Sequence, residues 1–408
     1  MRRLLQPRLL LVLLLAAGVS IYGLLLAGRD GLACPAEESG CGWTLSLVDS
    51  ALGYWPMPRG MAIDPEGNIH LAGESYPDAT DYTRNEVLLA KYDASGTPIW
   101  VRHIRAPGAE GFNIAYGLAL DPAGNICIGG ITDGSYDDAS QLPGRKGFVA
   151  RYDAHGRQLW AVDRPREVLA VAHDRAGNCY ASSNLGVTKI TAQGRVAWSL
   201  SHPTSGIVLT PDGVPYIIGP GAEATRPRLV RLDSAGRIAR EMTLQLGRES
   251  GWSGLQFSRF ALKADNSGHL YLHANVSGTD RLGNIRIVAY LAKLTYYGQL
   301  LWERHYGVEG ERWDTFDHVL DDHGILMSGM HQSITCPCPL NSFVMRYDTE
   351  GNLQWVRQHT ISQDNGAGSI GVDRHGNYYI AGGTRGVLDG QPLARERSNT
   401  PFIARNRP

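Results

Sequence analysis

Histidine and acidic side chains are the first candidates for chemistry, because a hydrolase or lyase needs a general base and a group that orients it. The chain has 13 histidines. Asp317 and His318 form an adjacent pair that no internal pattern explains. No histidine has both an orienting carboxylate and a nucleophile at a recognisable spacing, so no catalytic residue is predicted. Five other histidines recur at fixed places in a repeat, where we expect structural roles: His103, His155, His305, His323 and His375.

Metal ligands are not predicted either. The acidic loops Asp78–Asp81 and Asp133–Asp138 offer oxygen atoms, but neither has the alternating carboxylate spacing of a dedicated calcium loop. Cys336 and Cys338 are separated by one residue, which is too close for a usual zinc knuckle. We therefore expect no cofactor and solvated charges in both loops, with Ca²⁺ as a weak alternative.

The six cysteines fit a compartment in which disulfides persist. Cys127 and Cys179 lie inside predicted strands, where a free buried thiol is the commoner state. The pairing of the others cannot be read from their spacing. They are the disulfide candidates: Cys34, Cys41, Cys336 and Cys338.

These residues have to be positioned by a unit that recurs about seven times along the chain. Asp opens each of its tight turns because the carboxylate accepts a backbone N–H two residues on, and Gly closes the turn because the backbone needs a positive φ. The first turn, Asp-x-x-Gly, begins at Asp64, Asp121, Asp174, Asp265 and Asp373, with degraded copies at Asp212 and Asp321. A second turn precedes a Trp at Trp100, Trp160, Trp198, Trp302 and Trp355, and Arg240 takes this place in one unit.

Between the turns the sequence alternates apolar and polar residues, as in Ile69–Ala72 and Phe148–Arg151. This is the two-residue period of β-strands. Each unit therefore predicts four antiparallel strands, and such units repeated about every 50 residues are typical of a β-propeller. We predict an all-β fold with seven four-stranded blades over residues 43–408. The Trp of each outer strand is expected to pack against the neighbouring blade.

The two ends of the repeat predict how the ring closes. The last unit stops after its third strand, and a matching fourth strand lies near the other end of the chain, at Trp43–Ser46. The step from Trp43 to Asp64 equals that from Trp100 to Asp121, which is 21 residues in both cases. The N-terminal strand should therefore complete the last blade and cover an edge that would otherwise pair with other chains.

Both tight turns of a blade are predicted on one face of the disc, so the variable loops share the opposite face, where binding is usually found. Residues just before each innermost strand would ring the central channel on that face. Their mixed chemistry suits a polar ligand, although a solvated channel mouth explains it as well. The candidates are Arg59, Tyr116, Glu167, Ser205, Arg259, Asp314, Phe316 and Asn365.

Residues 1–34 are predicted to be a targeting segment. Three arginines precede an uncharged run from Leu9 to Gly28, which is long enough to span a bilayer. Positive charge before the run places the folded body outside the cytoplasm, in the periplasm or at the cell surface. An uncleaved anchor helix is favoured, and cleavage, which would give a secreted protein, or lipidation at Cys34 are the alternatives. Residues 35–42 form a linker.

The charge is almost balanced, with 39 Lys and Arg against 40 Asp and Glu, and no basic run stands out. Nucleic-acid binding is therefore not expected, because it depends on basic tracks that follow phosphates. We expect a monomer that contacts the membrane only through its N-terminal segment.

The units resemble the bacterial β-propeller repeat known as SBBP, and more loosely NHL and pyrroloquinoline-quinone-type repeats. The resemblance rests on D-x-x-G-N-x-Y/C/H-x-x-G and F-V-x-R-Y-D-x-x-G-x-x-x-W, and it covers roughly residues 43–405. It implies a secreted or surface propeller. The third unit is shortened, the fourth lacks its Trp and the fifth has a longer loop, so these units depart from the pattern.

The favoured function is an exported or membrane-anchored propeller that binds a protein, peptide or glycan on its variable-loop face. The alternative is a propeller enzyme, a lyase or hydrolase, with a site at the channel mouth. A quinone-dependent dehydrogenase fits least, since that pattern requires eight blades and adjacent cysteines. A deep pocket with converging His and carboxylate groups would favour the enzyme.

Overall fold

The computed structural model describes residues 42–47, 55–78, 81, 83–136, 142, 144–221, 226–247, 252–334, 340–359, 365–384 and 400–407. Within these ranges every regular element is a β-strand, and none of the described segments forms a helix that could cross a membrane. The prediction of an all-β fold made of four-stranded antiparallel sheets is confirmed. The predicted anchor and the disulfide candidates Cys34, Cys41, Cys336 and Cys338 lie outside the described residues.

Four sheets each contain four strands that follow one another along the chain as antiparallel neighbours. Their strands are β2 (Trp55–Ile63), β3 (Ile69–Tyr76), β4 (Glu86–Tyr92) and β5 (Pro98–Ile104); β6 (Asn113–Leu120), β7 (Ile126–Thr132), β8 (Lys146–Tyr152) and β9 (Gln158–Arg164); β10 (Ala170–His173), β11 (Cys179–Ser183), β12 (Gly186–Ile190) and β13 (Val196–Ser201); and β14 (Gly206–Leu209), β15 (Pro215–Gly219), β16 (Arg228–Leu232) and β17 (Ile238–Thr243).

The remaining strands form one sheet of eight and one of four. The larger sheet consists of two antiparallel groups joined by a single parallel pair, Ile287 with Arg312. Its strands are β18 (Ser253–Ala264), β19 (His269–Thr279), β20 (Ile285–Thr295), β21 (Leu300–Tyr306), β22 (Glu311–Asp321), β23 (Gly324–Ser333), β24 (Asn341–Tyr347) and β25 (Leu353–His359). The smaller sheet contains β26 (Asn365–Val372), β27 (Tyr378–Thr384), β28 (Thr400–Asn406) and β1 (Trp43–Ser46).

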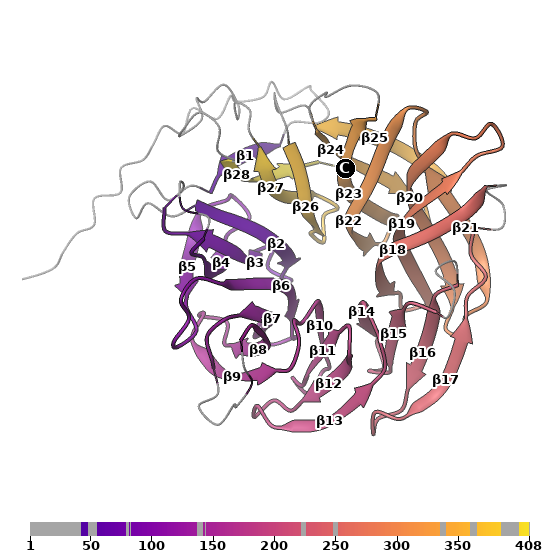
Figure 1. Ribbon diagram of the computed structural model, residues 1–408. Helices are drawn as coiled ribbons and strands as arrows, with labels where there is room; N and C mark the ends of the chain where they lie inside the picture. Colours follow the sequence, from indigo (N-terminus) through magenta and orange to yellow (C-terminus); the bar gives the residue numbers. More distant parts are fainter. Residues whose placement is uncertain are drawn as a thin grey trace, which may run out of the picture. The chain divides into compact units, whose positions relative to one another are not determined.

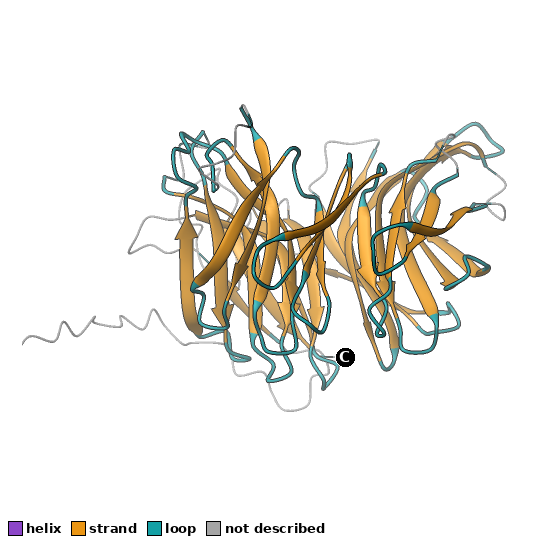
Figure 2. Ribbon diagram, turned by 90° about the horizontal axis from the view of Figure 1, so that it is seen from below, coloured by secondary structure: helices purple, strands orange, loops and turns teal. Residues whose placement is uncertain are grey.

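The first strand of each group lies innermost, and these strands form a ring of neighbours (Figure 1). Contacts run from β2 through β6, β10, β14, β18, β22 and β26 and back to β2. Seen edge-on, the strands run between two layers of loops (Figure 2). Because neighbouring strands are antiparallel, both tight turns of a group lie at one end and the variable loops at the other.

The tight turns have the hydrogen bonds that their sequence predicts. In the first turn the Gly67 amide donates to the Asp64 carbonyl at 2.9 Å, and the Asn68 amide donates to the Asp64 carboxylate at 2.7 Å. Gly67 has a φ of 87°, which is the left-handed conformation that glycine adopts without strain. The turn therefore depends on its Asp and its Gly for separate reasons, one for hydrogen bonding and one for backbone conformation.

The outer-strand Trp of one group packs on the second-turn Gly of the next. A Cβ atom at Gly194 would lie 2.9 Å from the Trp160 ring, and one at Gly156 would lie 3.1 Å from the Trp100 ring. The Trp160 indole N–H also donates to the Ala192 carbonyl of the next group at 2.9 Å. The predicted role of these Trp residues at the contact between blades is confirmed. Where Arg240 replaces Trp, Met242 packs on the equivalent glycine.

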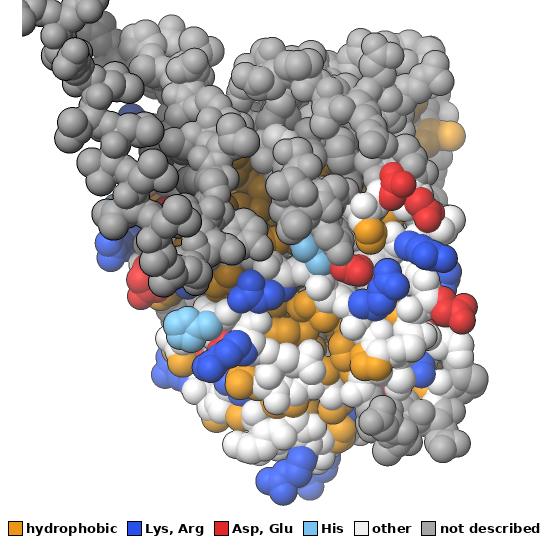
Figure 3. Space-filling view, turned by 90° about the vertical axis from the view of Figure 1, so that its left-hand side faces the viewer, with side chains coloured by type: hydrophobic (Ala, Val, Ile, Leu, Met, Phe, Trp, Pro, Cys, Tyr) orange, Lys and Arg blue, Asp and Glu red, His pale blue; other side chains and the backbone are white. Residues whose placement is uncertain are grey.

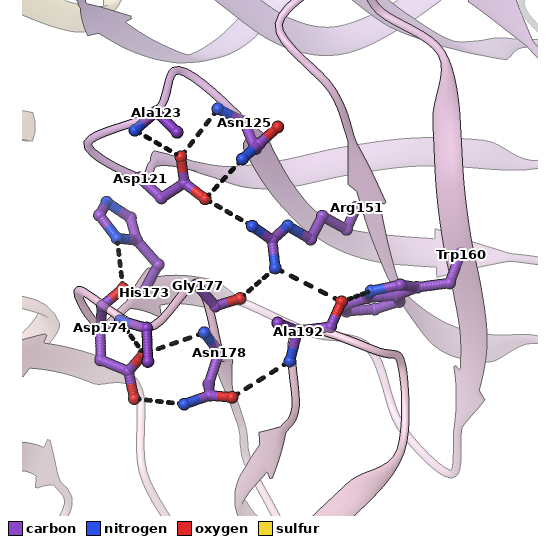
Figure 4. Close-up of polar contacts among 11 residues, drawn as sticks. Asp121, Ala123, Asn125, Arg151, Trp160, His173, Asp174, Gly177, Asn178 and Ala192 are labelled. Carbon is purple, nitrogen blue, oxygen red and sulfur yellow. Dashed lines mark hydrogen bonds and ion pairs between the residues drawn. The ribbon is translucent and has the colours of Figure 1, made fainter.

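Arg151 makes a second connection between neighbouring groups (Figure 4). Its guanidinium pairs with Asp121 of its own group and donates to the Gly177 carbonyl of the next group. It also reaches the Ala192 carbonyl at 3.5 Å, which accepts from Trp160 as well. The same pairing of a first-turn Asp with a third-strand cation recurs elsewhere: Asp64 with Lys91, Asp174 with Lys189, and Asp321 with Arg346.

The N-terminal strand completes the last sheet, as the spacing of the repeat predicts. β1 pairs antiparallel with β28, and Trp43 lies opposite Arg405. Trp43 packs on Gly96 of the β2–β5 sheet, where a Cβ atom would lie 2.9 Å from its ring, and makes an edge contact with Tyr379. Strands from the two ends of the chain thus share one sheet, and the Trp of that sheet seals it against the next.

We predict that Gly236→Ala destabilises the protein more than Gly213→Ala. Both glycines have a positive φ, 78° and 84°, so each substitution costs roughly 1–2 kcal/mol of backbone strain. A Cβ atom at Gly236 would lie 2.3 Å from the Trp198 ring, whereas nothing lies within 4 Å of one at Gly213. Overpacking should add about 1–3 kcal/mol at Gly236 alone. Denaturant unfolding measures both, and equal losses would show that the Trp contact does not contribute.

Removal of residues 42–47 should lower the denaturant midpoint and promote aggregation, because the edge of β28 would be left unpaired. Trp43→Ala keeps the backbone pairing of β1 and removes only the packing, so a smaller loss is expected. The comparison uses equilibrium unfolding and light scattering on the parent, the truncated chain and this variant. If the truncated chain unfolds at the same midpoint as the parent, β1 does not stabilise the last sheet.

Candidate functional site

β-Bulges interrupt the innermost strand in five of the groups, and they change the direction of the bulged side chains. The register of each shifts against the following strand, once in four of them and twice in β18. The extra residue interrupts the alternation of side chains between the two faces of the sheet, so its side chain can point in a different direction. The bulged residues are Arg59, Tyr116, Arg259 with Phe260, Phe316 and Gly368.

The bulged residues and their counterparts line one cavity along the axis of the ring, with a volume of about 540 Å³. Most lie five residues before the residue that opens the first tight turn, and Arg259 lies six before it. The β10 and β14 strands have no bulge, and their counterparts at this position are Leu169 and Ser205. A second cavity of about 520 Å³ adjoins the first and shares Arg59, Tyr116, Arg259, Phe316 and Gly368.

Arg59 is fixed by its neighbours. Its guanidinium pairs with Glu74, a carboxylate that is only 3% exposed and also accepts from Asn85 Nδ2 at 3.2 Å. The guanidinium carbon lies 5.7 Å from the centroid of the Tyr116 ring. Since Glu74 neutralises Arg59, this arginine positions Tyr116 and offers little free charge to a ligand.

Arg259 differs from Arg59 in both conformation and charge. It is the one residue other than glycine, among those the structure describes, with a positive φ, 54°. Its side chain is exposed and its guanidinium carbon lies 5.1 Å from the Phe316 ring centroid. In the described part of the chain no carboxylate pairs with it. A strained residue that carries an unneutralised charge at a cavity wall is a common feature of binding sites.

The structure brings together only part of the predicted site. Both cavities are lined by Arg59, Tyr116, Arg259 and Phe316. Ser205 lines only the cavity of about 540 Å³, which lies deeper in the channel than the other. These five predicted residues therefore lie around one space, as expected for the channel mouth.

The other three candidates lie elsewhere. Asp314 is buried, pairs with Arg312 and accepts from Asn275 Nδ2 at 3.3 Å, so it belongs to the contact between two groups of strands. Its prediction as a channel residue is wrong, because the bulge that follows it turns Phe316 to the channel instead. Glu167 is half-buried and lines neither cavity. The side chain of Asn365 lies outside the described residues, and Gly366 and Gly368 line the cavities on that strand.

The deeper cavity is also lined by three polar residues that their place in the repeat does not predict at the channel. They are Lys263 on β18, His273 on β19 and Asp317 on β22. The sequence singled out Asp317 with its neighbour His318, but gave no reason to connect them with His273. One signal was present: His273 is a polar residue in the otherwise apolar stretch Leu270–Ala274, on a strand that the repeat predicts to be buried.

His273 and His318 form a hydrogen-bonded pair, with 2.7 Å between their Nδ1 atoms. His318 Nε2 lies 3.2 Å from the Tyr271 carbonyl, which can only accept, so His318 carries its proton on Nε2. His318 Nδ1 then accepts from His273 Nδ1, and His273 Nε2 is left as a bare acceptor. Burial lowers the pKa of His318 well below its usual range, and burial together with Lys263 lowers the pKa of His273 to about 3. Both rings are therefore neutral near pH 7.

Asp317 has backbone partners on both carboxylate oxygens. Oδ1 accepts from the His318 amide at 2.8 Å and Oδ2 from the Ile370 amide at 3.3 Å. Burial raises the pKa of this carboxyl, and Lys263 and the two amides oppose that rise. The carboxylate is thus held in place on the cavity wall, with Lys263 supplying the nearby opposite charge.

The structure also places the remaining residues considered for chemistry. Cys127 and Cys179 are buried free thiols, as predicted. Asp81 accepts from the Thr83 amide at 2.9 Å, and Asp133 accepts from the Gly111 amide at 3.0 Å. Among the described side chains, no three His, Cys, Asp or Glu residues are gathered as metal ligands. On the side of the molecule shown in Figure 3, basic, acidic and apolar side chains are interspersed.

Comparison with known proteins supports the fold. No family model and no curated protein matches the chain. An ancestral GH74 enzyme is similar over 86% of this chain and 47% of its own, with 12% identity and a TM-score of 0.50. The extracellular domain of a putative hybrid two-component system from B. thetaiotaomicron matches 89% of this chain and 42% of its own, with 11% identity and a TM-score of 0.49. This chain therefore spans less than half the length of either protein.

A third similar structure is the Pan2 WD40 domain of Neurospora crassa, which matches 72% of this chain and 89% of its own, with 12% identity and a TM-score of 0.41. The GH74 enzyme is a β-propeller protein, and its similarity agrees with the four-stranded antiparallel sheets described above. The chain has a β-propeller fold. Identities this low describe the fold and not the activity.

We predict that the free energy of unfolding falls as the pH decreases from about 6.5 toward 3. In this window the unfolded chain protonates a histidine that the folded protein keeps neutral, since the pKa of His273 is lowered to about 3. One such histidine changes the free energy of unfolding by up to about 1.4 kcal/mol per pH unit. His273→Gln should make the fall shallower without removing it, because burial also lowers the pKa values of His70 and His173.

Chemical unfolding at several pH values provides the measurement. The quantity to compare is the slope of the unfolding free energy against pH, and not the absolute stability of the variant. His155→Gln, which removes an exposed histidine from a tight turn, is the control. Identical slopes for the parent and His273→Gln would mean that His273 is protonated in the folded protein.

Proposed function

We propose that this protein is an exported or membrane-anchored seven-bladed β-propeller that binds a protein, peptide or glycan bearing an anionic group at the mouth of its channel. The count of seven is supported by the closed series of contacts among the innermost strands β2, β6, β10, β14, β18, β22 and β26. The location rests on the apolar run Leu9–Gly28 and the arginines before it. The tight-turn and Trp motifs support membership of the SBBP-type repeat group.

Arg259 is the observation that supports a ligand with an anionic group. Its guanidinium faces the cavity without a carboxylate partner among the described residues, whereas Arg59 on the same wall is neutralised by Glu74. Arginine presents a planar set of donors that matches a carboxylate, phosphate or sulfate. The Phe316 ring under Arg259 restricts its orientation, so less entropy is lost when a ligand binds.

The size and lining of the mouth fit part of a larger ligand. The outer cavity, at about 520 Å³, combines the arginines with Met57, Pro58 and Met330. Pockets of this size that are mostly apolar with a few fixed polar groups are typical binding sites. A terminal group of a peptide or glycan can enter such a cavity while the rest of the ligand lies on the loops.

The alternative, a lyase or hydrolase, is supported by His273 and Asp317, which line the channel. His273 Nε2 is available to accept a proton, but a pKa of about 3 makes it a poor general base near neutral pH. No Ser, Cys or Thr is hydrogen-bonded to it within the described segments. Binding is therefore the function that the geometry supports best.

Arg259→Gly is the test of this proposal. Glycine relieves the positive φ, so this variant should be more stable than the parent by about 1 kcal/mol. It should nevertheless bind anionic ligands at least tenfold more weakly, because a hydrogen bond to a charged group contributes roughly 1.5–3 kcal/mol. Arg259→Lys keeps the charge and should retain part of the affinity.

The measurement is binding of the soluble body, residues 42–408, to arrays of acidic and neutral peptides and glycans, followed by calorimetry at two salt concentrations. Arg237→Ala, which removes an exposed arginine paired with Asp233 in a tight turn, serves as the control. If Arg259→Gly retains the affinity of the Arg237→Ala control for every ligand, the channel-mouth site is wrong.

A further inference from the structure

The channel below Arg259 has a polar wall that the binding of an anionic group does not use. One cavity of about 540 Å³ contains Arg259 and, farther in, Lys263, His273 and Asp317. A ligand held at the mouth can therefore extend to these three residues without crossing a barrier. Most of the other side chains around this cavity are apolar: Met61, Leu118, Leu169, Val171, Ile207, Phe260, Leu262 and Phe316.

Lys263 and His273 lie on the same side of two paired strands. Ala261 is opposite His273 in the register of β18 and β19, and Lys263 follows Ala261 by two residues. Lys263 and His273 are therefore diagonal neighbours on one face, with their Cα atoms about 7–8 Å apart. That distance allows one small group to lie between an ammonium and an imidazole.

The free atom of His273 is an acceptor. Nδ1 is used by His318, whose own Nε2–H is used by the Tyr271 carbonyl. The His273 residue is only 1% exposed, and its Nε2 atom makes no hydrogen bond to any described residue. An acceptor of this kind on a cavity wall favours a ligand group that donates a hydrogen bond to it.

Lys263 supplies the donor. Its ammonium makes no hydrogen bond or ion pair with any residue in the described segments, although its charge acts on both histidines and on Asp317. Asp317 balances this charge, and its two oxygens accept from the His318 and Ile370 amides. The polar wall is thus neutral as a whole and offers a donor and an acceptor side by side.

We propose that this wall is a subsite for a hydroxyl group, and that the ligand is a glycan whose acidic group binds Arg259. A hydroxyl oxygen accepts from Lys263 and donates to His273 Nε2 through a single atom. A peptide group meets this pair less well, because its N–H and C=O point in opposite directions. The apolar side chains around the cavity suit the C–H faces of a sugar ring. The inference rests on the proposed function, because it assigns the class of the ligand that the mouth binds.

The test uses an array of uronic-acid-terminated oligosaccharides, their neutral counterparts and acidic peptides, with calorimetry on the best member of each class. Lys263→Met removes the donor and keeps the length of the side chain. We expect it to weaken both kinds of oligosaccharide at least tenfold and to leave acidic peptides unaffected. Arg259→Gly should instead abolish the preference for acidic over neutral oligosaccharides.

Two further variants keep the result interpretable. Asp317→Asn keeps one oxygen that can accept from a backbone amide and removes the charge that balances Lys263. It should weaken the binding of oligosaccharides, as Lys263→Met does. Arg237→Ala is the control, because this exposed tight-turn arginine lines neither cavity. It should bind as the parent does.

The two proposals fail in different ways. Arg259-dependent binding of acidic peptides without any oligosaccharide would overturn the glycan subsite and leave the proposed function standing. Oligosaccharide binding that survives Lys263→Met and Asp317→Asn unchanged would also overturn the subsite. Absence of any Arg259-dependent binding across the array would remove the proposed function itself.

Discussion

The contact between an outer-strand Trp and a glycine of the next blade is the interaction on which the ring depends. The glycine is needed twice, once because its φ is positive and once because a Cβ atom would lie within the van der Waals radius of the indole, as at Gly194 with Trp160. The Trp in turn donates to a carbonyl of the neighbouring turn. Among the described residues, contacts of this kind link five pairs of neighbouring blades, and Met242 replaces the Trp at Gly298. The contact of Trp43 with Gly96 closes the ring.

Because these contacts lie at the outer strands and the tight turns, the innermost strands are free to vary. The residues at equivalent places in their blades differ in chemistry: Arg59 is cationic, Tyr116 and Phe316 are aromatic, and Gly368 has no side chain. The bulges direct these positions to the axis without disturbing the outer packing. A rigid perimeter with an adaptable centre is how one repeat can carry a site that differs from blade to blade.

The polar wall of the channel has a free-energy cost that the apolar parts of the core avoid. Neutral buried histidines must be kept unprotonated, and a carboxylate must be held among apolar side chains. The structure reduces this cost by giving His318 and Asp317 backbone partners. On this wall, His273 Nε2 and the Lys263 ammonium have no hydrogen-bond partner among the described residues and are left for a ligand.

The sequence by itself determined the turns, the strands and the way the ring closes, because these depend on local rules. Asp and Gly set the turn conformation, alternation sets the strands, and the Trp spacing identified β1 as the missing strand. It also gave Arg59, Tyr116, Arg259 and Phe316 from their place in the repeat.

Tertiary structure decided which of these groups are free. Pairing with Glu74 neutralises Arg59, and Asp314 turns away from the channel because a bulge, which no local rule places, comes after it. His273 and His318 are 45 residues apart in the chain, and their contact exists only because β22 packs against β18 and β19. Hydrogen bonding and charge compensation act through space, so the spacing of residues along the chain could not reveal them.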